Sequence, residues 1–217
     1  MTVRGMVFFD IDGTLVPSKS SGSFLAARLG HQKVLDNAEL RYAAGELTNE
    51  QVSVIDAEGW RGIDADTVDR WLEELPLISG IDEVTAWCRS RLIEPVLASL
   101  AWQPVSDSIA TRFGFTPNGG PRVGMSGSTF DGTVAEHFDE YDKRDRAVAL
   151  AAEQGVPLRH CCAIGDSRSD IPLFEVLPTS LALNAGVAAR QAATFSIVTE
   201  DLTDVLPWLE EWECGFD

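Results

Sequence analysis

Short apolar runs alternate with helical patterns along most of the chain, and this alternation constrains the fold more than any other feature. Strands are expected at residues 6–9, 93–99, 160–164, 181–183 and 195–198. Helices are expected at residues 105–113, 143–154, 171–177, 187–193 and 202–211. Strand–helix units joined by short loops predict an α/β fold, with a Rossmann-like parallel sheet as core and helices on both of its faces.

Residues 18–77 interrupt this alternation, because they show helical patterns and no convincing strand. Four short helices are expected there, at residues 24–29, 34–44, 49–58 and 64–74. We expect residues 18–77 to form an inserted α-helical cap on a core made of residues 1–17 and 78–217, and a plain bundle that extends the core is the alternative. Residues 114–128 are rich in Gly, Pro and Ser, which predicts turns and a short hairpin around residues 122–124 and 129–131.

The chain is strongly acidic, with 34 acidic and 17 basic residues and a net charge of −17. Such a surface repels nucleic acid and anionic membranes, so neither is expected as a partner. No apolar run approaches the roughly 18 residues that a membrane span needs, and the N-terminal run is too short for a signal peptide. The cysteines and histidines lack the spacing of zinc ligands. We therefore expect a cytoplasmic protein whose anion-binding site is local.

The first apolar strand ends in Asp10-Ile11-Asp12-Gly13-Thr14. Ligands of open α/β sheets bind at the carboxyl ends of the strands, and residues i and i+2 of an extended chain point the same way. Clustered carboxylates repel each other and need a cation, and their hard oxygen atoms suit Mg²⁺. Gly13 permits the sharp turn that lets backbone amides face an anion. A strand end with solvated acids is the alternative interpretation of this pentapeptide.

Three further positions fit the same kind of site. The strand at residues 160–164 ends in Gly165 and Asp166, with Asp170 four residues later, so neighbouring strand ends could direct several aspartates to one point. Ser99 closes another apolar strand and could donate its hydroxyl to an anion, and Lys143 opens a helix from which it could neutralise phosphate charge. A capping serine and a solvated lysine are the ordinary alternatives, and Arg144 and Arg146 could compete for the role of the lysine.

Taken together and in this order, the motifs resemble the haloacid dehalogenase-like superfamily, and the helical block after the first strand resembles its phosphoserine-phosphatase-like branch. The resemblance implies that Asp10 is the nucleophile that forms an aspartyl-phosphate and that Asp12 is the acid and base. It implies Mg²⁺ bound by Asp10, the Asp12 main-chain carbonyl and Asp166. It also implies phosphate binding by Ser99 and Lys143 with help from Thr14 and the region of Gly13, and a supporting role for Asp170, which orients Lys143 or metal-bound water.

The expected function is that of a Mg²⁺-dependent phosphoric monoester hydrolase acting on a small phosphorylated metabolite, as a monomer or homodimer. A phosphotransferase and a catalytically silent phosphate-binding relative are the alternatives, and Asp12 disfavours dehalogenation because dehalogenases of the family lack this second aspartate. Phosphoserine phosphatases carry a carboxylate and an arginine where an ungapped count places Lys19 and Asp56, so both charges are reversed. Leu100 and Ala101 also replace the usual glycines after Ser99. Other cap residues that could contact the substrate are Arg28, Arg41, Trp60 and Arg61.

Overall fold

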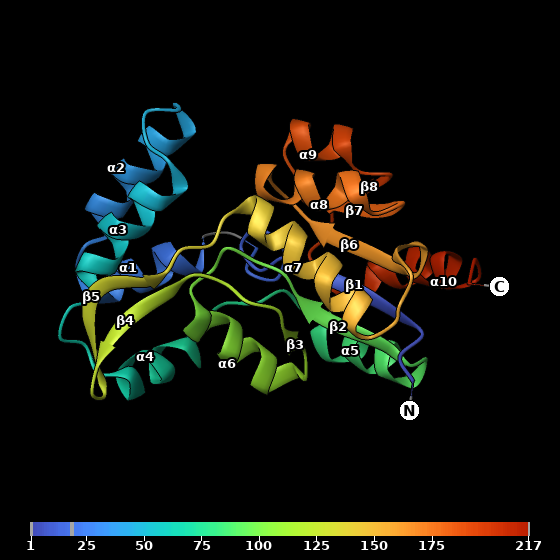
Figure 1. The fold of residues 1–217 in the computed structure, drawn as a ribbon, viewed down its shortest axis with the longest axis horizontal. Coiled ribbons are helices and arrows are strands. Elements are labelled where there is room, and N and C mark those ends of the chain that lie inside the picture. Colours follow the sequence, from blue (N-terminus) through green and yellow to red (C-terminus); the bar gives the residue numbers. More distant parts are fainter. Residues whose placement is uncertain (1, 18–19, 217) are drawn as a thin grey trace.

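A six-stranded parallel sheet forms the centre of the protein in a computed structural model that describes residues 2–17 and 20–216 (Figure 1). The strand order is β3-β2-β1-β6-β7-β8, and every neighbouring pair is parallel. The strands are β1 (Gly5–Phe9), β2 (Ile93–Leu97), β3 (Thr116–Pro117), β6 (Cys161–Gly165), β7 (Thr179–Leu183) and β8 (Phe195–Ile197). The expected α/β fold class is therefore confirmed.

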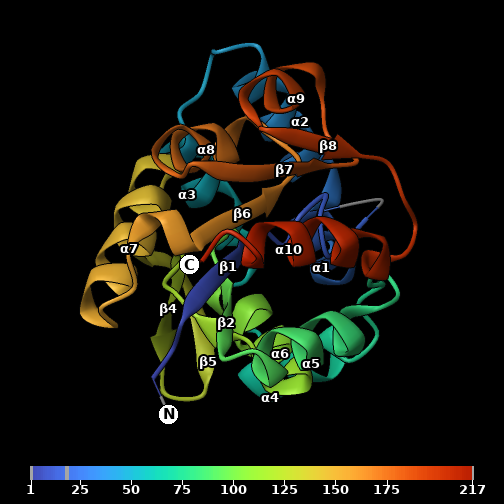
Figure 2. The same cartoon turned by 90° about the vertical axis from the view of Figure 1, so that its right-hand side faces the viewer.

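Helices cover both faces of the sheet (Figure 2). One face packs against α7 (Glu140–Glu153), α8 (Ile171–Val176) and α9 (Val187–Ala192). The other packs against α5 (Ile81–Ser90), α6 (Gln103–Phe113) and α10 (Leu206–Glu213). Successive side chains of a strand point to opposite faces, so Cys161 contributes to the first layer and Cys162 to the second. Burial on both sides explains why these strands are apolar throughout.

The four expected helices between residues 18 and 77 are present as α1 (Ser21–Leu29), α2 (Gln32–Ala43), α3 (Asn49–Gly59) and α4 (Ala65–Leu72). The N-terminus of α1 is capped by Ser20, whose hydroxyl accepts from the Ser23 amide, and a capping box begins α3. Helices α1, α2 and α3 pack on one another, whereas α4 lies against α6 of the sheet layer. Together α1–α4 cover the end of the molecule toward which β1 and β2 run (Figure 1).

A hairpin of β4 (Arg122–Ser126) and β5 (Thr129–Glu136) lies beside the helices and explains the position of α4. The segment between α3 and α4 pairs with it: the Gly62 amide donates to the Phe130 carbonyl at 2.7 Å, and the Phe130 amide donates to the Ile63 carbonyl at 2.8 Å. This pairing, which we call the clasp, carries the chain away from α3 before α4 begins. The Trp60 ring packs edge-on against Phe130 beneath it, with ring centroids 4.9 Å apart.

Several boundaries differ from expectation for local reasons. Strand β6 begins at Cys161 because Leu158–His160 forms a 3₁₀ turn, and β2 ends at Leu97, two residues before Ser99. The last expected helix is a 3₁₀ turn followed by α10, which starts at Leu206 just before Pro207, a residue suited to a first helical turn. Helix α5 falls where no element is expected from the sequence. Among the described residues, no helix is both long and apolar enough to cross a membrane.

Candidate active site

Asp10 directly follows β1, which lies between β2 and β6 in the middle of the sheet. Its main-chain amide donates to the Ile164 carbonyl at 2.9 Å, which continues the β1–β6 pairing by one residue. The side chain is almost entirely buried, with 4 % of the residue exposed. A carboxylate in this position is rigidly placed and poorly solvated, two conditions that favour a reactive role over a structural one.

Lys143 is the cationic partner of this carboxylate. It lies in the first turn of α7, is 1 % exposed, and donates from Nζ to Asp10 Oδ1 at 2.8 Å and to Asp170 Oδ1 at 2.6 Å. Burial lowers the pKa of Lys143, but the two carboxylates outweigh burial, so its pKa lies above the ordinary value and the ammonium stays charged. Arg144 pairs with Asp145 instead, so it does not replace the lysine.

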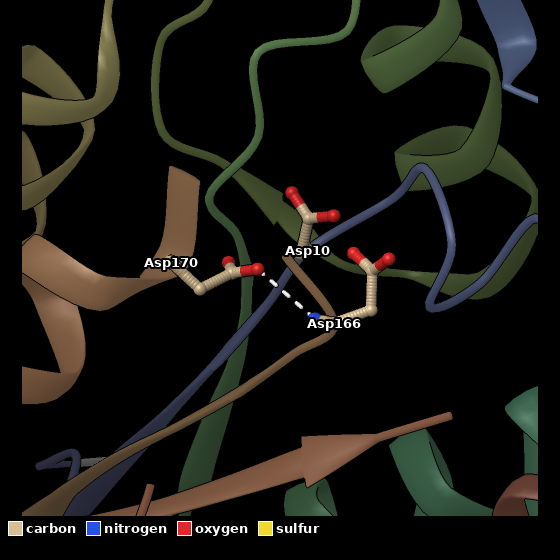
Figure 3. Close-up of side chains that lie close together, drawn as sticks. All are labelled: Asp10, Asp166 and Asp170. Atoms are coloured by element: carbon tan, nitrogen blue, oxygen red, sulfur yellow. Dashed lines mark hydrogen bonds between the residues drawn. The ribbon is translucent and has the colours of Figure 1, made fainter. Parts of the chain in front are cut away.

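Asp166 and Asp170 come from the loop after β6 and point different ways (Figure 3). Asp170 Oδ2 accepts from the main-chain amides of Asp166 and Ser167, each at 3.0 Å, while its Oδ1 accepts from Lys143. A Cβ on Gly165 would lie 2.2 Å from the Asp170 carboxyl carbon, so a glycine is needed for this fold-back. Both oxygens of Asp170 thus accept hydrogen bonds within the protein, whereas Asp166 Oδ1 is buried and has no partner among the described residues.

One carboxylate oxygen from each of Asp10, Asp166 and Asp170 lies within 4.8 Å of the other two, which is an arrangement that could hold a metal ion. Burial raises the pKa of Asp10 to about 7, an effect that Lys143 opposes. Burial, with Asp10 and Asp170 nearby, raises the pKa of Asp166 to about 8. The raised pKa values show that the ionised forms of these two neighbouring carboxyls need more positive charge than the surrounding residues supply. A bound cation would supply it.

Gly13 gives Asp166 the space it occupies. Its φ is +87°, and a Cβ there would lie 2.1 Å from Asp166 Oδ2. The turn from Ile11 to Val16 is closed by backbone hydrogen bonds, among them Gly13 amide to Val16 carbonyl at 2.9 Å. The next residue, Thr14, is fully buried, and its hydroxyl has no hydrogen-bond partner among the described residues. The turn that follows Asp10 therefore holds a buried hydroxyl that has no partner among the described residues.

Asp12 is bound by the first residue of α1. Its Oδ1 accepts from the Ser21 amide at 2.5 Å, and its Oδ2 accepts from the Ser21 hydroxyl at 3.1 Å. Burial raises the pKa of Asp12, and the hydrogen bonds from Ser21 oppose that shift. Ser99, 3 % exposed, accepts from the Ala101 amide with its hydroxyl oxygen, which orients its side chain in the loop after β2.

The groups described above all lie in a segment that matches one known protein family. Residues 7–175 match the family of haloacid dehalogenase-like hydrolases. The chain belongs to this family. The match covers all of the residues described above, from Asp10 to Asp170. The expected family and the expected hydrolase class are therefore confirmed.

The chain is similar to several phosphoserine phosphatases. A phosphoserine phosphatase of Streptomyces coelicolor is 25 % identical over 202 residues, which are 93 % of this chain and 49 % of that protein. One from Streptococcus thermophilus is 24 % identical and is covered over 97 % of its length by 96 % of this chain. A solved phosphoserine phosphatase with a phospho-aspartyl intermediate analogue superposes with a TM-score of 0.84 at 19 % identity, over 95 % of this chain and 99 % of that one. The structural likeness shows a shared fold, and these relatives are consistent with a phosphoric monoester hydrolase of this family.

Several contacts of this haloacid dehalogenase-like site could not be read from the sequence. Asp56 on α3, 5 % exposed, accepts from the Trp102 indole nitrogen at 2.6 Å and lies 2.6 Å from His31 Nε2. Asn118, which directly follows β3, is buried, and its side-chain nitrogen has no partner in the described structure. An ungapped count draws attention to Asp56 but not to its partners, and no sequence signal indicates Asn118, so only the tertiary structure reveals these contacts.

The cap residues proposed as substrate contacts lie elsewhere. Arg28 pairs with Glu74 at 2.8 Å, Arg41 pairs with Glu46 at 3.3 Å, and Trp60 is fully buried in an aromatic cluster. Arg61 is exposed near Gly132 of the hairpin. None of these four lines the cavity beside Asp12. The remaining candidate, Lys19, lies outside the described residues.

Proposed function

We propose that the protein is a Mg²⁺-dependent phosphatase that hydrolyses a small phosphomonoester through an aspartyl-phosphate on Asp10. The observation that carries this proposal is the buried arrangement of Asp10 at the end of a central strand, 2.8 Å from Lys143 and beside Asp166. A buried lysine and a cation together can offset the repulsion between a carboxylate and a phosphoryl group. A surface cluster of solvated acids would provide neither.

The residues fit a magnesium ion. The available donors are all oxygens, Asp166 Oδ1 is buried and unpartnered, and Gly13 leaves clearance for the Asp166 carboxylate. We assign the ion to the carboxylates of Asp10 and Asp166 and to the main-chain carbonyl of Asp12. When bound, Mg²⁺ would neutralise negative charge on the transferring phosphoryl group. Both oxygens of Asp170 accept hydrogen bonds, and one of them holds Lys143, so we assign Asp170 to positioning Lys143 and the loop that carries Asp166.

In the first step an oxygen of Asp10 attacks phosphorus as the bond from phosphorus to the leaving oxygen breaks. Asp12 donates a proton to that oxygen, and its raised pKa favours the protonated form that this step requires. In the second step Asp12 takes a proton from water as the water oxygen attacks phosphorus. The bond between phosphorus and the Asp10 oxygen breaks, which releases inorganic phosphate and regenerates the Asp10 carboxylate. Covalent catalysis divides one difficult displacement into two easier ones.

The phosphoryl oxygens need donors, and Lys143, Ser99 and Thr14 are the proposed ones. Lys143 is charged and fixed by two carboxylates, which keeps its ammonium at the reacting end of β1. The Thr14 hydroxyl is buried without a partner, so a phosphoryl oxygen would satisfy it. The Ser99 hydroxyl already accepts a hydrogen bond from Ala101 and keeps its own proton to donate. Donors fixed before the reaction stabilise the transition state without reorganising.

We further propose that residues 18–77 act as a cap over a core of residues 1–17 and 78–217. The contact between Ser21 and Asp12 supports this, because it links the first cap helix to the proposed acid and base. The proposed substrate is a small phosphorylated metabolite, bound by a monomer or homodimer that needs neither nucleic acid nor membrane. A cytoplasmic location belongs to the proposal and agrees with the free state of all four cysteines.

The decisive experiment measures hydrolysis of p-nitrophenyl phosphate and a panel of phosphorylated metabolites with and without Mg²⁺. Wild-type protein should turn over only with the metal, and Asp10→Asn should abolish turnover, while the exposed control Asp145→Asn should not. Acid quenching during turnover should leave one phosphoryl group on the peptide that contains Asp10. A folded Asp10→Asn variant with the wild-type rate would refute the covalent mechanism, and phosphate transfer to an added alcohol in preference to water would identify a phosphotransferase.

A further inference from the structure

A cavity of about 180 Å³ opens beside Asp12, on the side away from the sheet. It lies between α1, α2 and α3 and the loop after β2, and its walls include Ser21, Glu39, Asp56, Leu100 and Trp102. A group that protonates the leaving oxygen must contact it, so the rest of the leaving group would extend from Asp12 into this cavity. This step rests on the function proposed above.

The titratable side chains in the described wall of the cavity are acidic, apart from the phenol of Tyr42. Three carboxyls line it, those of Asp12, Glu39 and Asp56, and none of its described lining residues is basic. Burial raises the pKa of Glu39, and the neighbouring carboxylates of Asp12, Asp36 and Asp56 add to the effect. The carboxyls therefore repel one another across the cavity, and a ligand cation would relieve that repulsion whereas a ligand anion would increase it.

Asp56 cannot turn away from an unsuitable ligand, because both of its oxygens are engaged. Oδ2 accepts from the Trp102 indole nitrogen, and Oδ1 lies 2.6 Å from His31 Nε2. Trp102 belongs to the same loop as Ser99, so the contact joins α3 to the proposed phosphate-binding loop. His31 in turn packs over Gly59, where an added Cβ would lie 2.2 Å from its ring. The side chain of Asp56 is 7 % exposed, which makes its charge a built part of the cavity wall.

We propose that this enzyme selects a phosphorylated amino alcohol, whose leaving group bears an ammonium and no carboxylate, and that Glu39 and Asp56 determine the selection. Both residues project from the helices that cover the site and not from the sheet. The ammonium would sit between two carboxyls, and a carboxylate on the same leaving group would face them without any basic residue of the described wall to offset it. The inference thus excludes phosphoserine as the preferred substrate, although relatives are phosphoserine phosphatases.

Three substrates separate the effect of the ammonium on the leaving group from the effect of the carboxylate. O-Phosphoethanolamine carries the ammonium alone, O-phosphoserine adds one carboxylate, and ethyl phosphate lacks both. We expect kcat/KM for O-phosphoethanolamine to exceed each of the other two by about tenfold or more, since one unfavourable or missing charge contact of about 1.4 kcal/mol changes a ratio tenfold. Equal or greater kcat/KM with O-phosphoserine would overturn the inference.

Paired variants test the residues themselves. Glu39→Gln and Asp56→Asn should each reduce the preference for O-phosphoethanolamine over O-phosphoserine several-fold, and the ratio cancels any general loss of active protein. The matched control is Glu58→Gln on α3, an exposed acid that does not line the cavity, and it should keep the wild-type ratio. An unchanged ratio in both cavity variants, or an equal change in the control, would refute the selection.

A binding measurement separates this inference from the proposed function. If wild-type protein hydrolyses no phosphomonoester with Mg²⁺, the proposed function fails. The ratio of dissociation constants for O-phosphoethanolamine and O-phosphoserine, measured by calorimetry on Asp10→Asn with Mg²⁺ present, then decides the inference alone. Tighter binding of O-phosphoethanolamine by about tenfold supports it, and equal or weaker binding contradicts it.

Discussion

Replacing Gly13 with alanine tests whether the Asp166 carboxylate must occupy its present position. Gly13 has φ +87°, and the new Cβ would lie 2.1 Å from Asp166 Oδ2 and 2.3 Å from its carboxyl carbon. Atoms do not approach so closely, so either the turn or the Asp166 side chain must move. Because Asp10 and Asp166 are the proposed magnesium ligands, the substitution should have a larger effect on the affinity for Mg²⁺ than on the free energy of unfolding.

A matched substitution at Gly30 separates the cost of a left-handed alanine from the effect of displacing Asp166. Gly30 has φ +84°, close to that of Gly13, but an added Cβ would have no neighbour within 4 Å. Both variants share the cost of a left-handed alanine, about 1–2 kcal/mol of the free energy of unfolding. Only Gly13→Ala displaces Asp166, and loss of a properly placed ligand environment typically lowers metal affinity by about 10–100-fold.

The assay combines urea unfolding without metal and calorimetric titration with Mg²⁺ for wild type, Gly13→Ala and Gly30→Ala. Gly30→Ala should lose stability and keep the wild-type dissociation constant for Mg²⁺. Gly13→Ala should lose at least as much stability and also bind the ion at least tenfold more weakly. If Gly13→Ala binds Mg²⁺ as tightly as Gly30→Ala does, Asp166 is not a ligand in the position seen here, and the proposed metal site is wrong.

Further predictions concern the acid, the pH dependence and the cap contact. Asp12→Asn should lower kcat for alkyl phosphates by roughly 10²–10⁴-fold, and much less for p-nitrophenyl phosphate, whose leaving group needs no proton; equal losses would contradict proton donation. The pKa values of about 7 for Asp10 and about 8 for Asp166 exceed the ordinary 3.8, so the metal-free folded state binds more protons than the unfolded state. The melting temperature of the metal-free protein should therefore fall as pH rises from about 4 to 8. The affinity for Mg²⁺ should rise over the same range, because the ion displaces those protons. A melting temperature that calorimetry finds independent of pH would refute this reasoning. Trp102→Phe leaves Asp56 Oδ2 without its donor and should cost about 1–3 kcal/mol in urea unfolding; a stability equal to that of wild type would show that the bond adds nothing.

The parts of this structure that could be predicted follow from periodicity and from the geometry of parallel sheets. Apolar runs identified β1 and β6, and because their carboxyl ends share one edge, Asp10 and Asp166 had to lie close together. The opposite orientations of Cys161 and Cys162 followed from strand alternation in the same way. The roles assigned to these acids remain proposals.

The parts that could not be predicted depend on which surfaces meet in three dimensions. Asp56 and Trp102 are 46 residues apart and have no motif, so nothing local indicates that they share a hydrogen bond. The same holds for the contact between Asp12 and Ser21, since the sequence predicts a helix only at residues 24–29 and indicates neither its start at Ser21 nor the residue that it contacts. The position of α4 against α6 arises from backbone pairing at the clasp, which leaves no trace in side-chain patterns.

The clasp also limits how substrate can reach the site. Two chain crossings, before α1 and after α4, would define an axis about which the helices could rotate as one body. The pairing of Gly62 and Ile63 with Phe130 adds a third attachment away from that axis, so rotation must either break these hydrogen bonds or carry the hairpin along. Strand β5 leads within a few residues into α7, which bears Lys143. If residues 18–77 open as the proposed cap and carry the hairpin with them, the motion would reach α7, so entry of the substrate and placement of the Lys143 charge would be coupled.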